Sequence, residues 1–217
     1  MNHPKSKLGL KPTFRKILVF AIASLLLAVP AHASNEAGPY FTLTGSIDTF
    51  EDTTLTNVDP SISVTDTKIA QERGLGFNHS IGYQFKNSFS AELEFSYKDR
   101  DFRGVVDGDM ASKSFIANGI YSFNIREFYT PYVGYGIGCT FHEVNLHPSE
   151  KFHEGFGSRT DTTLAYQLKM GVDMEFSRKL SLLVGYRYFT SNNPDFKGWF
   201  SGIVASHGIE AGVKFHF

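Results

Sequence analysis

Residues 162–189 read TTLAYQLKMGVDMEFSRKLSLLVGYRYF, and apolar side chains recur there at every second position. From 163 to 176 they alternate with polar or small residues, and a second alternating run covers 180–188. A repeat of two is the period of a β-strand, because successive side chains of a strand point to opposite faces. The stretch therefore predicts two antiparallel strands joined by a short turn at 177–179, each with one face against an apolar medium.

The same alternation recurs along most of the chain. It covers residues 40–48, 74–85, 89–98, 114–123, 131–141 and 206–217, and is least regular in 114–123. The connections are of two kinds: three are short (86–88, 124–128 and 177–179), and four are long and polar (51–72, 99–112, 142–161 and 190–204). Short turns at one end and long loops at the other are typical of outer-membrane barrels. We predict an all-β fold, an eight-stranded antiparallel up-and-down transmembrane β-barrel.

The first 33 residues have the features of a cleaved Sec-type signal peptide. A basic leader without acidic residues precedes an apolar run at 17–29, and Ala31-His32-Ala33 supplies a small-x-small cleavage site. The apolar run is too short for a transmembrane helix, which takes roughly 20 residues. We expect a signal peptide at 1–33 and an exported barrel domain at 34–217, with an uncleaved anchor as the alternative.

Composition excludes several function classes. A formal net charge of −1 is unlike that of proteins that bind nucleic acid through a basic surface, so we expect no nucleic-acid partner. Cys139 is the only cysteine, which excludes an internal disulfide and a cysteine-based zinc site. Aromatic residues make up 15 % of the chain and there are 20 glycines, a composition that argues against a helical bundle.

Residue size indicates which face of each strand is inside. A lipocalin is also an exported eight-stranded barrel, but it would turn its apolar face inward. Here the polar faces carry Gly74, Gly76, Gly82, Gly134, Gly136, Gly138, Gly171, Gly185, Gly208 and Gly212. An eight-stranded barrel is just wide enough inside for side chains to fill, so small residues belong there. We therefore expect the polar face in the lumen and the large aromatic face in lipid.

Several segments resemble one known family. ELEFSY (92–97), FYTPYVGYGIG (128–138), the stretch 162–189 and HGIEAGVKFHF (207–217) look like the opacity-protein-like outer-membrane surface antigens, which are small OmpA/OmpX-type barrels. The resemblance implies eight strands, a Gram-negative outer membrane and variable loops used for surface contact. It transfers no ligand residues, because loops are not shared among members.

The last predicted strand ends on an aromatic residue. Val213, Phe215 and Phe217 lie on its apolar face. This pattern resembles the signal read by the outer-membrane assembly machinery, which we expect as a partner. Outer-membrane lipids, lipopolysaccharide and an extracellular or host ligand of the loops are the other expected partners of a monomer.

Nine charged residues are expected to point into the lumen. They are Glu92, Glu94, Lys98, Lys169, Asp173, Glu175, Arg187, Glu210 and Lys214. Five acids and four bases nearly balance, so they cannot form a selectivity ring of one sign. Because an unpaired buried charge is costly, we expect these groups to pair across the lumen and plug it.

Other constellations are weak. The stretch from Asp99 begins like a calcium loop but has Met110 where the bidentate Glu belongs, leaving at most loose calcium binding by Asp107 and Asp109. The glycines of 134–138 are spaced by two with no helix after them, so they line a strand and hold no phosphate. Histidines and carboxylates gather in the third long loop without a metal-ligand spacing. That cluster comprises His142, Glu143, His147, His153 and Glu154.

We expect no catalytic, cofactor or metal site. The function predicted is that of a surface antigen or adhesin-like barrel with four exposed loops. A narrow porin or a conduit for small hydrophobic molecules is the alternative. A lipid-modifying acyl hydrolase would need a Ser/His/acid set, for which the chain offers His147 and Ser149 with Glu150 or Glu143.

Overall fold

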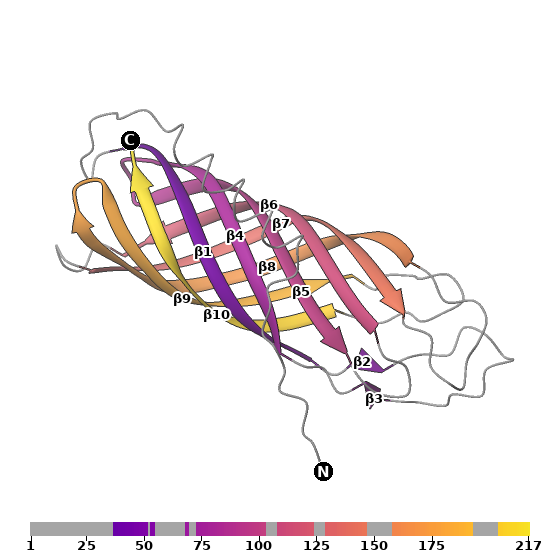
Figure 1. Cartoon of the computed structure of the whole chain (residues 1–217). Coiled ribbons are helices and arrows are strands. Elements are labelled where there is room, and N and C mark those ends of the chain that lie inside the picture. The colour runs from indigo at the N-terminus through magenta and orange to yellow at the C-terminus, as the bar shows by residue number, and fades with distance from the viewer. Residues whose placement is uncertain are drawn as a thin grey trace, which may run out of the picture. The chain divides into compact units, whose positions relative to one another are not determined.

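Eight long antiparallel strands close into a barrel in the order β1-β10-β9-β8-β7-β6-β5-β4 (Figure 1). The structure is a computed structural model, and it describes residues 37–51, 53–54, 68–69, 73–102, 108–123, 129–146, 158–192 and 204–217. The strands are β1 (Gly38–Phe50), β4 (Arg73–Gln84), β5 (Phe89–Phe102), β6 (Gly108–Ser122), β7 (Tyr129–Leu146), β8 (Ser158–Ser177), β9 (Leu180–Ser191) and β10 (Val204–His216). The predicted eight-stranded up-and-down barrel is confirmed.

The two ends of the barrel differ. At the turn end, the strands are joined through residues 85–88, 123–128 and 178–179, and β1 begins and β10 ends there. At the loop end, the joining segments are 51–72, 103–107, 147–157 and 192–203. Two short strands not expected from the sequence, β2 (Thr53–Thr54) and β3 (Lys68–Ile69), pair within the first of these segments. The proposed signal peptide, residues 1–33, lies outside the described residues.

Two of the predicted loops were wrong in extent. β5 and β6 pair as far as Phe102 and Gly108, and β7 and β8 pair as far as Asn145 and Ser158. Most of the segment 99–112 and both ends of 142–161 are therefore strand. The sequence pattern ended early because alternation requires an apolar medium on one face, whereas backbone pairing continues after the strands leave it.

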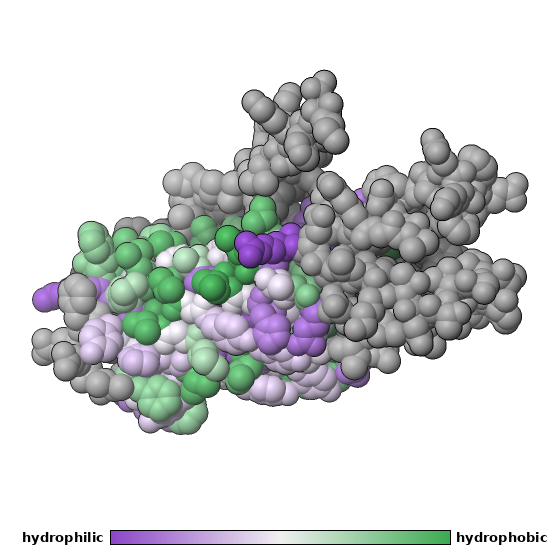
Figure 2. All heavy atoms as spheres, turned by 90° about the horizontal axis from the view of Figure 1, so that it is seen from below, coloured by the Kyte–Doolittle hydropathy of each residue, from purple (hydrophilic) through white to green (hydrophobic). Residues whose placement is uncertain are grey.

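The apolar face of each strand points out. Phe176 is 75 %, Ile209 69 % and Leu93 64 % exposed, and Figure 2 shows hydrophobic residues gathered on the surface of the barrel wall. Aromatic pairs flank the turn end, among them Phe89 with Tyr121, whose ring centroids are 5.0 Å apart. Such an outer band with aromatic margins is the surface of a barrel that lies in lipid. In the described residues, no helix is long and apolar enough to cross a membrane.

The polar face points into the barrel, where glycines make room for large side chains. The Tyr40 ring lies over Gly82, so that an added Cβ there would come within 2.6 Å of the phenolic oxygen. The hydroxyl of Tyr132 lies 2.7 Å from a Cβ built on either Gly171 or Gly185. These glycines therefore leave the space that the Tyr40 and Tyr132 rings occupy in the narrow lumen.

Candidate functional site: the charged lumen

Arg187 of β9 is the centre of a hydrogen-bonded network inside the barrel. Its guanidinium donates to Glu210 of β10 at 2.6 and 3.0 Å, and it binds both carboxylate oxygens of Glu94 on β5. It also donates to Asn78 at 3.3 Å and Gln167 at 3.0 Å. β5 and β9 are four steps apart in the ring of eight, so the contact with Glu94 spans the lumen between opposite walls.

Lys169 of β8, the cross-strand partner of Arg187, shares the same carboxylates. Its Nζ lies 3.0 Å from Glu94 Oε2, 3.7 Å from Glu92 Oε2 and 4.0 Å from Glu210 Oε1. Two cations therefore stand among three acids, all of them buried. Paired charges with several hydrogen bonds each can persist in such a place, whereas a single charge could not.

Apolar side chains flank this network within the lumen. Ile116, Ala165 and Phe189 form one buried cluster, and Ile120, Tyr132 and Leu183 form another. On β6, Asn118 is the inward residue between Ile116 and Ile120, and it donates to Glu94 at 3.3 Å. The isoleucines that blurred the pattern of 114–123 thus fill the lumen, and they lower the dielectric around the paired charges.

A second ion pair lies closer to the loop end. Lys98 Nζ is 2.7 Å from Asp48 Oδ1 and donates to Ser206 at 3.0 Å, and Ser46 donates to the other oxygen of Asp48 at 2.7 Å. Asp48 is the last residue of the alternating run 40–48 and was not among the nine charged residues expected in the lumen.

His142 was expected in the third long loop, and that expectation is wrong. It lies on β7 with its side chain fully buried, between hydroxyls of Ser112 and Ser191 at 2.9 and 3.0 Å. Glu143 is the next residue of the strand and lies on the outer face, 3.7 Å from Lys113. The two residues point to opposite sides of the wall, so the predicted cluster does not form around them.

Arg100 is a further lumen residue that sequence reasoning missed. It stands on β5 within the stretch read as a loop, and its guanidinium lies 4.2 Å from the centroid of the Phe50 ring. Continued alternation from Lys98 to Arg100 is the signal that could have found it.

Another ion pair lies at the turn end. Lys214 pairs with Asp173 at 3.0 Å and lies over the ring of Tyr40, whose hydroxyl donates to Glu92 at 2.9 Å. Glu175 is half-buried where the register of β8 and β9 shifts. All nine expected lumen charges thus stand on the inner face, seven of them buried and Asp173 and Glu175 partly so.

The remaining candidates are dispersed. Val213 and Phe215 lie on the outer face of β10, opposite Leu43 and Phe41 of β1, and the Phe217 N–H donates to Pro39 O at 3.1 Å. No group of three or more potential metal-ligating side chains occurs in the part of the chain that the structure describes. His147, Ser149, Glu150, His153, Glu154 and Asp107 lie outside the described residues.

This arrangement can hold the barrel shut. The network joins side chains of β1, β4, β5, β6, β8, β9 and β10. The hydrogen bonds from Arg187 to Glu94 and Asn78 tie β9 to β5 and β4, with which β9 does not pair through its backbone. Arg187, Glu94 and Glu210 are therefore engaged with one another inside the barrel.

Comparisons with known proteins agree with this geometry. A family model described as "Outer membrane protein beta-barrel domain" matches residues 19–217. The crystal structure of Neisserial surface protein A is 19 % identical, with a TM-score of 0.59 over 86 % of this chain and 100 % of its own. The attachment invasion locus protein Ail of Yersinia pestis, solved with the heparin analogue sucrose octasulfate, is 19 % identical, with a TM-score of 0.51 over 83 % and 99 %. No curated protein matches the chain.

Proposed function

This chain belongs to the outer membrane protein beta-barrel family, and on that premise we propose that it is a surface antigen or adhesin-like protein. It is an outer-membrane barrel of a Gram-negative bacterium, and its resemblance to the opacity-protein-like barrels is confirmed by the family match and the shared fold. Its loop end is the outward end, and contact with an extracellular ligand is made by the four loop-end segments.

One observation carries this proposal: the Arg187–Glu94 contact between opposite walls of the barrel. A pore would need those charges solvated along an open path, whereas here each is bonded to the other. Eight strands leave room for side chains but not for a wide channel. With the lumen closed by the Arg187 network, the functional surface of the protein is the set of segments that the barrel presents outside.

The charge of those segments bears on the ligand. Residues 51–72, 103–107, 147–157 and 192–203 carry nine acidic and four basic side chains, a formal charge of −5. Ail was solved with a sulfated, anionic ligand. Like charges repel at a binding surface, so we propose a neutral or basic ligand for this chain in place of a heparin-like one.

Export and insertion belong to the same proposal. Residues 1–33 direct secretion and are removed, and the barrel then inserts as a monomer among outer-membrane lipids and lipopolysaccharide. Phe217, with Phe215 and Val213 on the outer face of the closing strand, is the signal for the assembly machinery.

Two measurements on intact cells test the proposal. Protease should cut within 52–71 and within 147–157 and leave 86–88 whole, because turns at the other end face the periplasm. Cleavage at 86–88 alone would show that the orientation is inverted. Deleting 55–67 should then lower adhesion to matrix-coated surfaces at an unchanged membrane level. Equal adhesion would remove this segment from the contact surface.

A further inference from the structure

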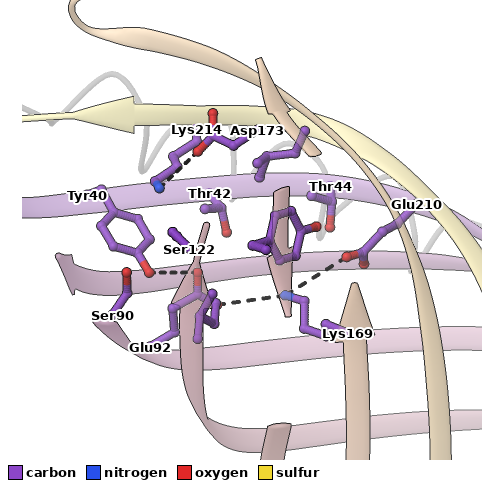
Figure 3. A pocket seen from close by; sticks show the side chains of 13 residues that line it. Tyr40, Thr42, Thr44, Ser90, Glu92, Ser122, Lys169, Asp173, Glu210 and Lys214 are labelled. Carbon is purple, nitrogen blue, oxygen red and sulfur yellow. Dashed lines mark hydrogen bonds and ion pairs between the residues drawn. The ribbon is translucent and has the colours of Figure 1, made fainter. Parts of the chain in front are cut away.

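The turn-end half of the lumen contains a cavity that the ion network does not fill. Its volume is about 30 Å³, and its lining includes Thr42, Thr44, Ser90, Glu92, Lys169 and Glu210 (Figure 3). One water needs roughly 10–15 Å³, so the space admits water-sized molecules. The lining is polar on several sides, as a hydrated cavity requires.

Glu92 supplies a specific reason for a ligand there. Its Oε1 accepts the Tyr40 hydroxyl at 2.9 Å, but its Oε2 is buried without a hydrogen bond. Lys169 Nζ lies 3.7 Å from this oxygen, but its hydrogen bond goes to Glu94 at 3.0 Å. A carboxylate only accepts hydrogen bonds, so the missing partner is a donor. Leaving such an atom unsatisfied is costly.

The cavity ends where the ion network begins, on the turn-end side of that network. Successive inward residues of β1 show the boundary: Tyr40, Thr42 and Thr44 line the cavity, whereas Ser46 is engaged with Asp48. Toward the turn end, the lining includes Ser122 and Asp173, which are only half-buried. The space therefore reaches solvent at the turn end and is closed toward the loop end.

We propose that this cavity is a blind vestibule, entered from the turn end, that binds water-sized hydrogen-bond donors, one of them on Glu92 Oε2. The entrance faces the periplasm if the orientation proposed above holds, but the vestibule itself does not depend on that orientation. Water and ammonium can both donate a hydrogen bond to this oxygen. Because Lys169 and Lys214 are positively charged neighbours, they favour water over ammonium. A solute that enters from the periplasm then meets a dead end at the Arg187 network.

Single cysteines placed along the lumen test the vestibule. In a Cys139→Ser background, Thr42→Cys and Thr44→Cys are compared with Ser46→Cys and Ser114→Cys, which replace residues of similar burial outside the cavity lining. The folded barrels are treated in detergent with hydrogen peroxide, a reagent little larger than water, and thiol oxidation is followed by mass spectrometry. A variant is compared only if it is folded, which is shown by the same difference in gel mobility between unheated and boiled samples as in the parent protein.

We expect positions 42 and 44 to be oxidised at least about tenfold faster than 46 and 114, because the sealed positions react only through local opening. Slow oxidation at all four positions would overturn the vestibule and leave the closed lumen standing. Fast oxidation at all four positions would overturn both the blind vestibule and the closed lumen.

A crystal structure that resolves lumen waters tests the ligand itself. It should place a water within about 2.7–3.2 Å of Glu92 Oε2. Soaking with thallium(I), which marks monovalent cation sites by its anomalous signal, separates the two donors. A thallium peak beside Glu92 Oε2 would show that the ligand there is a cation and not water. Neither water nor thallium beside this oxygen would overturn the proposal that Glu92 binds a hydrogen-bond donor.

Discussion

Replacing Arg187 with methionine removes the cation that spans the lumen and keeps the length of its side chain. Glu210 then retains one cation within reach, Lys169 at 4.0 Å, and Glu94 keeps Lys169 at 3.0 Å. Removing one partner of a buried ion pair costs about 3–5 kcal/mol, because the other charge stays buried without its partner. We expect Arg187→Met to lower the free energy of unfolding by an amount in that range.

The matched control is an ion pair on the outer face. Lys113 and Glu143 approach to 3.7 Å, and both are more than two-fifths exposed. Lys113→Met should therefore cost at most about 1 kcal/mol. Adding Glu210→Gln to Arg187→Met should restore part of the loss, because it removes a buried carboxylate that has lost both hydrogen bonds from Arg187 and keeps Lys169 only at 4.0 Å.

Urea titration of the refolded barrel, followed by gel mobility of unheated samples, measures all four proteins. Wild-type stability in Arg187→Met would contradict the role given to the network. So would an equal loss in Lys113→Met, since it would show that burial does not set the magnitude.

Two further predictions concern other parts of the structure. Gly171→Ala should destabilise the barrel by about 1–3 kcal/mol, because the added Cβ would meet the Tyr132 hydroxyl and the backbone of β9. In the control, Gly119→Ala, the added Cβ would point into open space, so the stability should not change. Equal urea midpoints for the two variants would contradict the packed lumen. Deleting Phe217 should reduce the amount of barrel in outer-membrane fractions severalfold, and Trp199→Ala should not; equal membrane levels in immunoblots would withdraw the assembly signal.

Sequence reasoning worked where the strands cross the apolar band. Between 163 and 188, alternation identified two strands, their turn and the inner face on which Lys169 and Arg187 stand. A lipid-facing side and a polar lumen impose opposite requirements on neighbouring residues, so the period of two is strong there.

The same reasoning failed beyond the band. From 99 to 102 and from 142 to 146, both faces of the strands can be polar, so the sequence looks like a loop although the backbone remains paired. His142 and Arg100 were missed for that reason. The partners within the lumen were also out of reach, because which residues meet across a barrel depends on the stagger of its strands. Balanced charge predicted pairing, but not that Arg187 would reach Glu94 on the opposite wall.

Conductance of the purified wild-type barrel in planar bilayers tests the closed lumen most directly. With Arg187 bridging Glu94 and Glu210, we predict no long-lived open state at either polarity. Large, stable conductance steps from the wild-type protein would contradict the closed lumen, and would favour the narrow porin over the surface antigen.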